Sequence, residues 1–131
     1  MKLLRLATTL NPTSAPYNQF SLGFKAIIDQ TYCSLLKNDV PIDNSINGFH
    51  ADGSIFKMIK LVRKLVAQNN YDVVHIHSGV TGIILLIAIF PLRISLLQKT
   101  VFTLHNSWHI IKSRNQILDF IVMLASRKIC T

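Results

Sequence analysis

Two short apolar runs constrain the fold of this chain more than any other feature. They are VVHI within YDVVHIHSG (residues 71–79) and TVFTL within KTVFTLHNSWH (residues 99–109). Both are rich in β-branched residues, and such near-continuous apolar runs are typical of strands that are covered on both faces of a sheet. A segment of helical length separates them, and strands that alternate with helices predict a parallel sheet with helices on both faces. We therefore expect an α/β domain.

The other elements predicted from the sequence extend this alternation along the chain. The length of 131 residues predicts one domain over residues 1–131, and the sequence contains no internal repeat. We expect strands at residues 2–10 and 31–36, helices at 18–29, 54–70 and 113–127, a loop at 11–17 and a long polar connection at 37–53.

The helix predicted at residues 54–70 has the most regular pattern. Ser54 is suited to begin it, because its hydroxyl can accept a hydrogen bond from a backbone N–H of the first turn. At helical spacing, apolar residues fall on one arc, which predicts the buried side, and basic residues fall on the other. The apolar set is Ile55, Met58, Ile59, Leu61, Val62, Leu65 and Val66, and the basic set is Lys57, Lys60, Arg63 and Lys64. The basic set is either a solvated face or a contact for anionic lipid.

Composition limits the classes of function. Half of the residues are apolar and 15% are charged, which is typical of a packed domain rather than a disordered chain. All six acidic residues are Asp, so chemistry that requires a Glu of this chain is excluded. The net charge of +8 favours anionic partners, namely nucleic acid, anionic lipid or phosphorylated substrates. The chain lacks a recognition-helix pattern and interleaved basic and aromatic residues, so we expect no nucleic-acid partner.

Three features bear on where the protein works. Cys33 and Cys130 form no CxxC pair, and we interpret them as reduced cysteines of a cytosolic protein. The apolar part of the N-terminus is short and interrupted by Arg5, which favours a first strand over a signal peptide. Residues 79–97 are nearly long enough to span a bilayer, but Pro91 and Arg93 interrupt them, so we expect a helix packed on both sides within the domain.

Three histidines lie at or near the ends of the two apolar runs. His75 and His77 are two residues apart and would share one face of a strand, and with His105 they offer a zinc-like set of imidazoles. No fourth ligand with suitable spacing is evident, so we expect no metal site. His75 lies between Val74 and Ile76 and is interpreted as a hydrogen-bonded core histidine. For His77 a structural and a functional role are both retained, and for His105 a functional role is favoured.

Small polar residues follow the predicted strands. In an open parallel sheet, ligands bind in the crevice beyond the carboxyl ends of the strands. A glycine there lets the backbone approach a ligand, and the next helix offers its N-terminal N–H groups to an anion. The candidate ligand-binding residues are Asn11, Thr13 and Ser14 after the first strand, His77, Ser78 and Gly79 after the second run, and Asn106 and Ser107 after His105. The sequence has no GxGxxG fingerprint after its first strand, so a dinucleotide site is not expected.

The segments YDVVHIHSG, KTVFTLHNSW and RNQILDFIVMLASRKICT, in this order, resemble the N-terminal half of family 4 glycosyltransferases with the GT-B fold. That family typically shows a D-V-[VI]-H-x-H strand, a helix, a T-x-H strand, and a helix that leads to a further strand. The segment NPTSAPYNQFSLGFKAII is similar to the acceptor-side loop and helix after the first strand of bacterial members. The resemblance covers essentially the whole chain. It implies a Rossmann-like parallel sheet that forms an incomplete N-terminal half of a GT-B fold.

The resemblance also implies an activity and roles for single residues. The family transfers a sugar from a nucleotide-sugar donor to a glycan or lipid-linked acceptor, with retention and without a metal or other cofactor, here in bacterial surface polysaccharide or glycolipid synthesis. The histidine of its T-x-H strand reaches the cleft near the transferred sugar, which implies a catalytic role for His105. His77 matches the cleft end of its strand. Asn11, Thr13 and Ser14 match the family's first loop, but the family's Gly-Gly is missing here.

The family's donor-binding domain, with its paired glutamates, is not contained in residues 1–131. The resemblance therefore implies that this chain alone does not turn over. The alternative is a non-enzymatic acceptor- or membrane-binding subunit that pairs with a separate catalytic chain and exposes an apolar patch where that partner docks. A different enzyme built on His105 ranks last, because no G-x-S-x-G elbow is present. We expect a cytoplasmic protein, with peripheral contact at the inner face of the cell membrane as an option.

Overall fold

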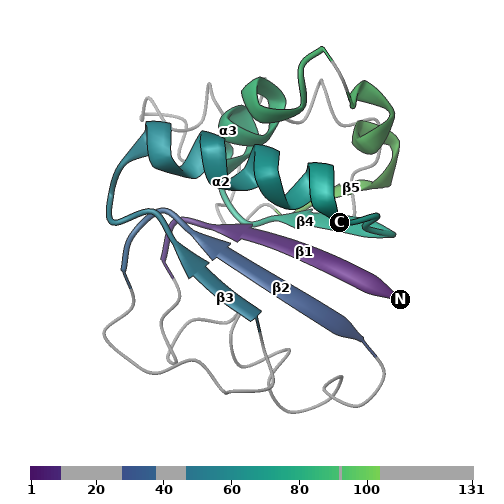
Figure 1. Cartoon of the computed structure of the whole chain (residues 1–131), viewed down its shortest axis with the longest axis horizontal. Helices are drawn as coiled ribbons and strands as arrows, with labels where there is room; N and C mark the ends of the chain where they lie inside the picture. Colours follow the sequence, from purple (N-terminus) through teal and green to yellow (C-terminus); the bar gives the residue numbers. More distant parts are fainter. Residues whose placement is uncertain (10–27, 38–46, 92, 104–131) are drawn as a thin grey trace, which may run out of the picture.

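The structure is a computed structural model, and it describes residues 1–9, 28–37, 47–91 and 93–103. Its centre is a five-stranded sheet in which every neighbouring pair of strands is parallel (Figure 1). The spatial order of the strands is β3-β2-β1-β4-β5. The predicted α/β fold with a Rossmann-like parallel sheet is thereby confirmed.

The first strand in sequence lies in the middle of the sheet. The strands are β1 (Lys2–Ala7), β2 (Asp29–Ser34), β3 (Asn47–His50), β4 (Val73–Ile76) and β5 (Thr100–Phe102). In the register, Arg5 is opposite Tyr32 of β2 on one side and His75 of β4 on the other. Parallel pairing requires a crossover connection between partners, which the helical segments provide for β4 and β5.

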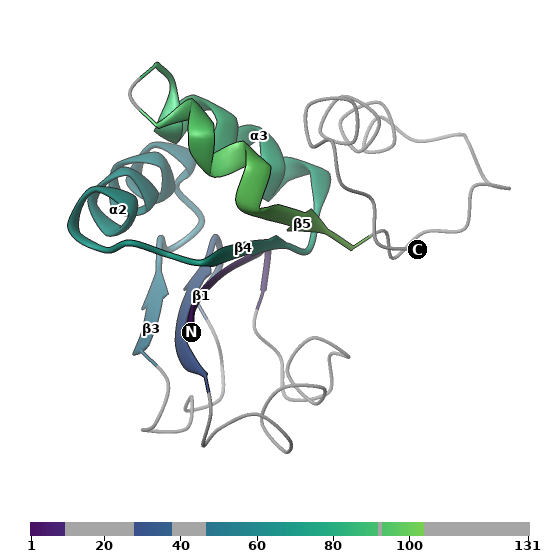
Figure 2. The ribbon, with the colours of Figure 1, turned by 90° about the vertical axis from the view of Figure 1, so that its right-hand side faces the viewer.

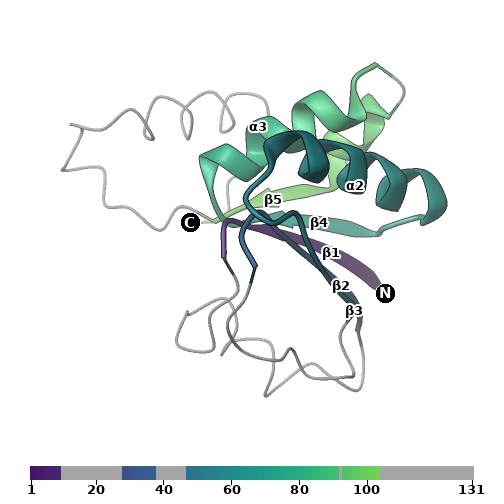
Figure 3. The same cartoon turned by 60° about the vertical axis from the view of Figure 1, so that its left-hand side comes forward.

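Three helical segments lie on the same face of the sheet, as the two edge-on views show (Figures 2 and 3). They are α2 (Ile55–Gln68), α3 (Gly79–Ile89) and the 3₁₀ helix η1 (Ile94–Lys99). Serine begins each α-helix: Ser54 Oγ accepts a hydrogen bond from Lys57 N at 3.3 Å, and Ser78 Oγ accepts one from Thr81 N at 3.3 Å. Asn69 ends α2, and its backbone N–H and side-chain amide both donate to Leu65 O.

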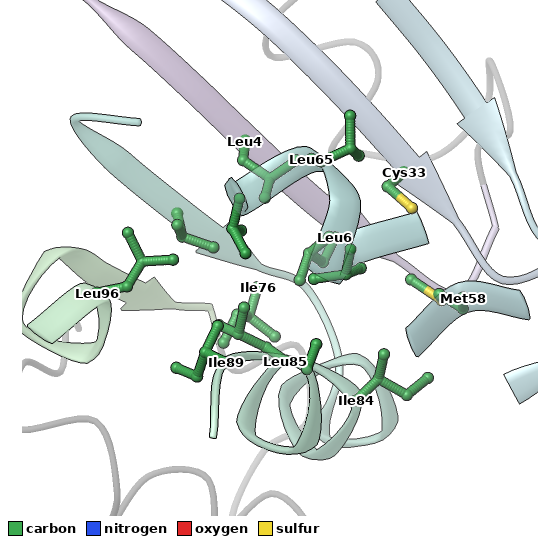
Figure 4. Packing of buried hydrophobic residues seen from close by; sticks show 14 of the residues in the cluster. Leu4, Leu6, Cys33, Met58, Leu65, Ile76, Ile84, Leu85, Ile89 and Leu96 are labelled. Atoms are coloured by element: carbon green, nitrogen blue, oxygen red, sulfur yellow. The ribbon is translucent and has the colours of Figure 1, made fainter. Parts of the chain in front are cut away.

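The main apolar core lies between these helices and the sheet (Figure 4). Alternate residues of the strands, such as Leu4, Leu6 and Ile76, point into it, as the period of two requires. The helices contribute residues at helical spacing. Fully buried side chains of this core include Met58, Val62, Ile84 and Leu85, and Leu96 of η1 closes one end.

Several predicted boundaries were wrong. The connection predicted at residues 37–53 contains the strand β3, whose four residues are all exposed. The first strand ends at Ala7 rather than residue 10, and the second runs from Asp29 to Ser34. Ile55, which we placed on the buried arc of α2, is 49% exposed because it lies in the first turn, beyond the edge of the core.

The apolar segment at residues 79–97 also differs from its prediction. It forms α3 and η1 rather than one helix, and it is not packed on both sides, because Ile87 and Phe90 are exposed. Within the described residues, no helix has the length and apolarity needed to cross a membrane. All helices that the structure describes lie on one face. The helix predicted at residues 113–127 falls outside the described residues, as does the helix predicted at 18–29 as far as residue 27; its predicted end is wrong, because Asp29 belongs to β2.

Candidate functional site at the carboxyl edge of the sheet

The strand order defines where a ligand site is expected. From the centre of the sheet the chain proceeds from β1 through β2 to β3 in one direction, and from β4 to β5 in the other. The order therefore reverses between β1 and β4. In open parallel sheets, the crevice at such a switch point, beyond the carboxyl ends of the strands, is the usual place for a ligand.

A cluster of three hydroxyl groups occupies this position. Thr8 follows β1, Ser78 follows β4, and their side-chain oxygens lie 3.0 Å apart although the two residues are 70 positions apart in sequence. Ser78 Oγ also lies 3.0 Å from the hydroxyl of Thr81. The Thr81 hydroxyl donates toward the carbonyls of Ser78 and Leu6, at 2.9 and 3.3 Å. We call Thr8, Ser78 and Thr81 the hydroxyl cluster.

The hydroxyl cluster lies at the N-terminus of α3. Ser78 is the N-cap, Gly79 is the first residue of the helix, and no acidic residue is present in its first turn. The partial positive charge of a helix N-terminus therefore has no acidic side chain within that turn to offset it. Hydroxyl groups beside backbone N–H groups can together hold a phosphate or the hydroxyls of a sugar.

His77 lies directly before this cluster and is buried. Its backbone N–H donates to Leu6 O at 2.9 Å, which continues the pairing of β4 with β1 beyond the last residue of the strand. The ring centroids of His75 and His77 are 4.0 Å apart, with planes inclined by 42°. The prediction that these two histidines share one face is confirmed.

That face is the one turned away from α2 and α3, and it is polar near its centre. His75 is half-buried and forms a hydrogen bond with the hydroxyl of Thr103, so it is a hydrogen-bonded histidine, although it lies outside the apolar core. Arg5, on the neighbouring strand, is fully buried, and its Nη1 donates to Tyr32 Oη at 3.1 Å. Burial lowers the pKa of the Arg5 guanidinium to about 10, and the contact with Tyr32 partly opposes that shift.

Sequence reasoning missed parts of the site. Thr8 and Thr81 were not singled out, although Thr8 follows the first strand as Ser78 follows β4, which was the available signal.

A second missed group lies at the end of β3, where His50 Nδ1 is 2.9 Å from Asp52 Oδ1 and Lys57 Nζ is 3.4 Å from Asp52 Oδ2. Lys57 and His50 lower the pKa of the Asp52 carboxyl, chiefly through its hydrogen bond with Lys57. They are exposed, so the contacts have the character of surface ion pairs.

The remaining predicted residues cannot be placed. Asn11, Thr13, Ser14, His105, Asn106 and Ser107 lie outside the described residues, and of the predicted cleft the structure brings together His77, Ser78 and Gly79. In the part of the chain that the structure describes, no group of three or more His, Cys, Asp or Glu residues is arranged to hold a metal ion.

No protein-family model matches the chain, and no curated protein matches it significantly. The site geometry and the resemblance of the sequence motifs are therefore the two grounds for assigning a function.

Proposed function

We propose that this chain is the acceptor-side part of a glycosyltransferase, which transfers a sugar from a nucleotide-sugar donor to a glycan or lipid-linked acceptor. One observation carries the proposal: the hydroxyl cluster of Thr8, Ser78 and Thr81 lies at the N-terminus of α3, where the strand order reverses. The motif resemblance of YDVVHIHSG and KTVFTLHNSW to family 4 glycosyltransferases supports the choice of reaction among those that such a site could serve.

In this proposal the residues of the site have separate roles. Thr8 and Ser78, which are half-buried, would bind hydroxyls of the acceptor sugar, while the fully buried Thr81 would hold Ser78 in place. Positioning of two reactants in this way lowers the barrier of a transfer reaction. The N-terminus of α3 would stabilise negative charge on a leaving diphosphate. By resemblance, His105 would contact the transferred sugar, with Asn106, Ser107, Asn11, Thr13 and Ser14 around the cleft.

The donor would be held by a second domain that residues 1–131 do not include. We therefore expect the 131-residue chain to transfer no labelled sugar from any nucleotide-sugar above the level of its His105→Ala variant. Transfer above that control would show that this chain turns over alone and would refute this part of the proposal.

Acceptor binding tests the site itself. Saturation-transfer NMR with a panel of glycosides is expected to detect at least one acceptor, with weakened binding in Ser78→Ala. Ser54→Ala is the matched control, because Ser54 caps α2 as Ser78 caps α3, with the same oxygen-to-nitrogen distance of 3.3 Å, but it follows the edge strand β3. A glycoside whose binding is weakened equally by the two substitutions, or by neither, would argue against a site at the hydroxyl cluster.

The second candidate is a non-enzymatic subunit that binds an acceptor or a membrane and pairs with a catalytic chain. The exposed apolar side chains of Ile87 and Phe90 favour it, because such a subunit needs an uncovered docking surface. Both candidates are proposed to act in the cytoplasm, with peripheral contact at the inner face of the membrane. Two results together would favour the subunit. The chain would bind an acceptor, and a co-purified partner would supply all of the transfer activity, which the His105→Ala substitution would leave unchanged.

A further inference from the structure

We propose that the outer face of the helical layer formed by α2, α3 and η1 binds the surface of an anionic lipid bilayer, with Ile87 and Phe90 as apolar anchors. In the edge-on view, α2, α3 and η1 lie together on one side of the sheet (Figure 3). This membrane-binding surface would bring the protein to a lipid-linked acceptor, and that part of the inference rests on the proposed function. Binding to the bilayer itself does not.

The charge of this layer is entirely of one sign. The segments Ile55–Gln68 and Gly79–Lys99 contain no acidic residue. They contain six cationic residues, all exposed: Lys57, Lys60, Arg63, Lys64, Arg93 and Lys99. The described acids nearest in sequence are already engaged, because Asp52 contacts Lys57 and Asp72 accepts a hydrogen bond from Lys2 N. A surface of several cations without acids complements anionic headgroups.

On α2 these cations form a stripe. Arg63 and Lys64 follow Lys60 by three and four positions, so the three cations share the face of α2 opposite its buried residues. Phe56 begins the same stripe, four positions before Lys60, and is 80% exposed. Because the apolar arc of α2 is packed in the core, its outward face offers a bilayer surface these cations and one exposed aromatic side chain.

Apolar side chains lie beside these charges. At the C-terminal end of α3, Ile87 is 48% exposed and Phe90 is 66% exposed. They border an open groove of about 550 Å³ that is lined by Arg63, Leu86, Ile87, Ile89, Phe90 and Leu97. Arg63 Nε donates to Ala88 O and its Nη2 donates to Ile87 O, both at 3.2 Å, so the guanidinium is fixed next to the apolar groove.

This combination favours a lipid surface over a protein partner. The core of a protein interface is depleted in lysine, whereas four of the six exposed cations of this helical layer are lysines and no acidic residue balances them. At a bilayer surface, the long stems of Lys and Arg can lie along the apolar boundary while their charged ends reach the phosphates.

The placement also fits a lipid-linked acceptor. The hydroxyl cluster lies at the N-terminus of α3, and the apolar anchors lie at its other end. The 11 residues of α3 correspond to about 16 Å at the rise of an α-helix. A lipid held at the groove could therefore present its headgroup sugar to the carboxyl edge of the sheet from a nearby membrane surface.

Vesicle sedimentation with the full 131-residue chain tests this inference without a donor or acceptor. We expect binding to vesicles of phosphatidylcholine mixed with phosphatidylglycerol, weak binding to phosphatidylcholine alone, and weaker binding as salt increases. Lys60→Gln and Lys64→Gln should each reduce the vesicle partition coefficient about fivefold, and Phe90→Ser should reduce it by a similar factor or more. The matched controls are Lys37→Gln and Leu36→Ser, which change an exposed lysine and an exposed leucine that belong to none of the three helices and should leave partitioning nearly unchanged.

Four outcomes would overturn the inference: no vesicle binding, equal binding to both vesicle types, equal loss in Lys37→Gln and Lys60→Gln, or no effect of Phe90→Ser. A dimer in sedimentation velocity that Phe90→Ser dissociates would likewise overturn it, since a second copy would then cover the patch. The vesicle experiment contains no sugar, so its result does not bear on acceptor binding at Ser78. Failure of the acceptor-binding test likewise would not contradict binding to vesicles.

Discussion

The hydroxyl of Thr8 lies 3.0 Å from the hydroxyl of Ser78, and this contact joins the ends of β1 and β4 across 70 positions of sequence. Both side chains follow central strands, and Ser78 is at the same time the N-cap of α3. One residue therefore connects the two strands of the switch point with the helix that follows them. A change at Ser78 is expected to affect both stability and ligand binding.

The stability effect of Ser78 can be separated from simple capping. Ser78→Ala should lower the free energy of unfolding by about 1 kcal/mol for the lost cap, and by roughly another 1 kcal/mol because the hydroxyls of Thr8 and Thr81 lose a partner. Ser54→Ala should show the capping cost alone. Urea denaturation of the two variants measures the difference, and equal losses would mean that the hydroxyl cluster adds nothing to stability.

Two positions of α2 that are two residues apart should differ strongly in how much truncation to alanine destabilises the fold. Met58 is fully buried against the sheet, whereas Phe56 is 80% exposed. We expect Met58→Ala to cost about 2–5 kcal/mol, because it leaves a cavity in the core, and Phe56→Ala to change stability by less than about 0.5 kcal/mol. Thermal and urea unfolding of both variants checks this, and a large loss in Phe56→Ala would show that its side chain is covered in solution.

Gly53 adopts a left-handed backbone conformation, with φ of 79°, in the turn before α2. A Cβ added there would lie 3.6 Å from Leu36 Cδ2, an ordinary contact, so the cost of Gly53→Ala should come from the backbone. We expect a loss of about 1–2 kcal/mol. Urea denaturation of Gly53→Ala, Leu36→Ala and the double variant checks the cause. We expect the two losses of unfolding free energy to add. If the cost were a clash with Leu36 instead, Leu36→Ala would remove it in the double variant.

Burial raises the pKa of the Cys33 thiol to about 12, from an ordinary value of 9.0. The folded state thus holds the proton more tightly than the unfolded state, so this group's contribution to stability is complete below pH 9 and is lost as the pH rises toward 12. The difference in unfolding free energy between the wild type and Cys33→Ala should therefore shrink over that range.

In a Cys130→Ser background, alkylation of Cys33 at neutral pH should follow the rate of unfolding, and rapid alkylation of the native state would contradict its burial.

The sequence was sufficient for the elements that carry strong local patterns. The helix α2 has an N-cap, an apolar arc and a terminating asparagine, and the structure confirms the cap, the asparagine and the arc apart from Ile55. The strand β4 was recognisable from VVHI, because a central parallel strand is apolar on both faces. These features depend on neighbours in sequence, which is why local reasoning recovers them.

The strand β3 and the hydroxyl cluster depend instead on distant partners. β3 consists of NGFH, which contains Gly and Asn and no apolar run, and it is a strand because it pairs with β2 at the edge of the sheet. The contact of Thr8 with Ser78 follows from the order of the strands, which pattern alone does not determine. The structure nevertheless places Ser78 and Gly79 just beyond the carboxyl end of β4, where one rule of parallel sheets led us to expect them.

The central position of β1 has a consequence for synthesis of the protein on the ribosome. The first strand to emerge pairs with β2 on one side, but its partner on the other side, β4, follows 70 residues later. Until then, one edge of the nascent strand exposes unsatisfied backbone groups. The core that covers Leu4 and Leu6 also contains residues of α3, η1 and β5. Residues as far as Phe102 must therefore leave the exit tunnel before the core can close, so the early chain is the stage at which chaperones would act.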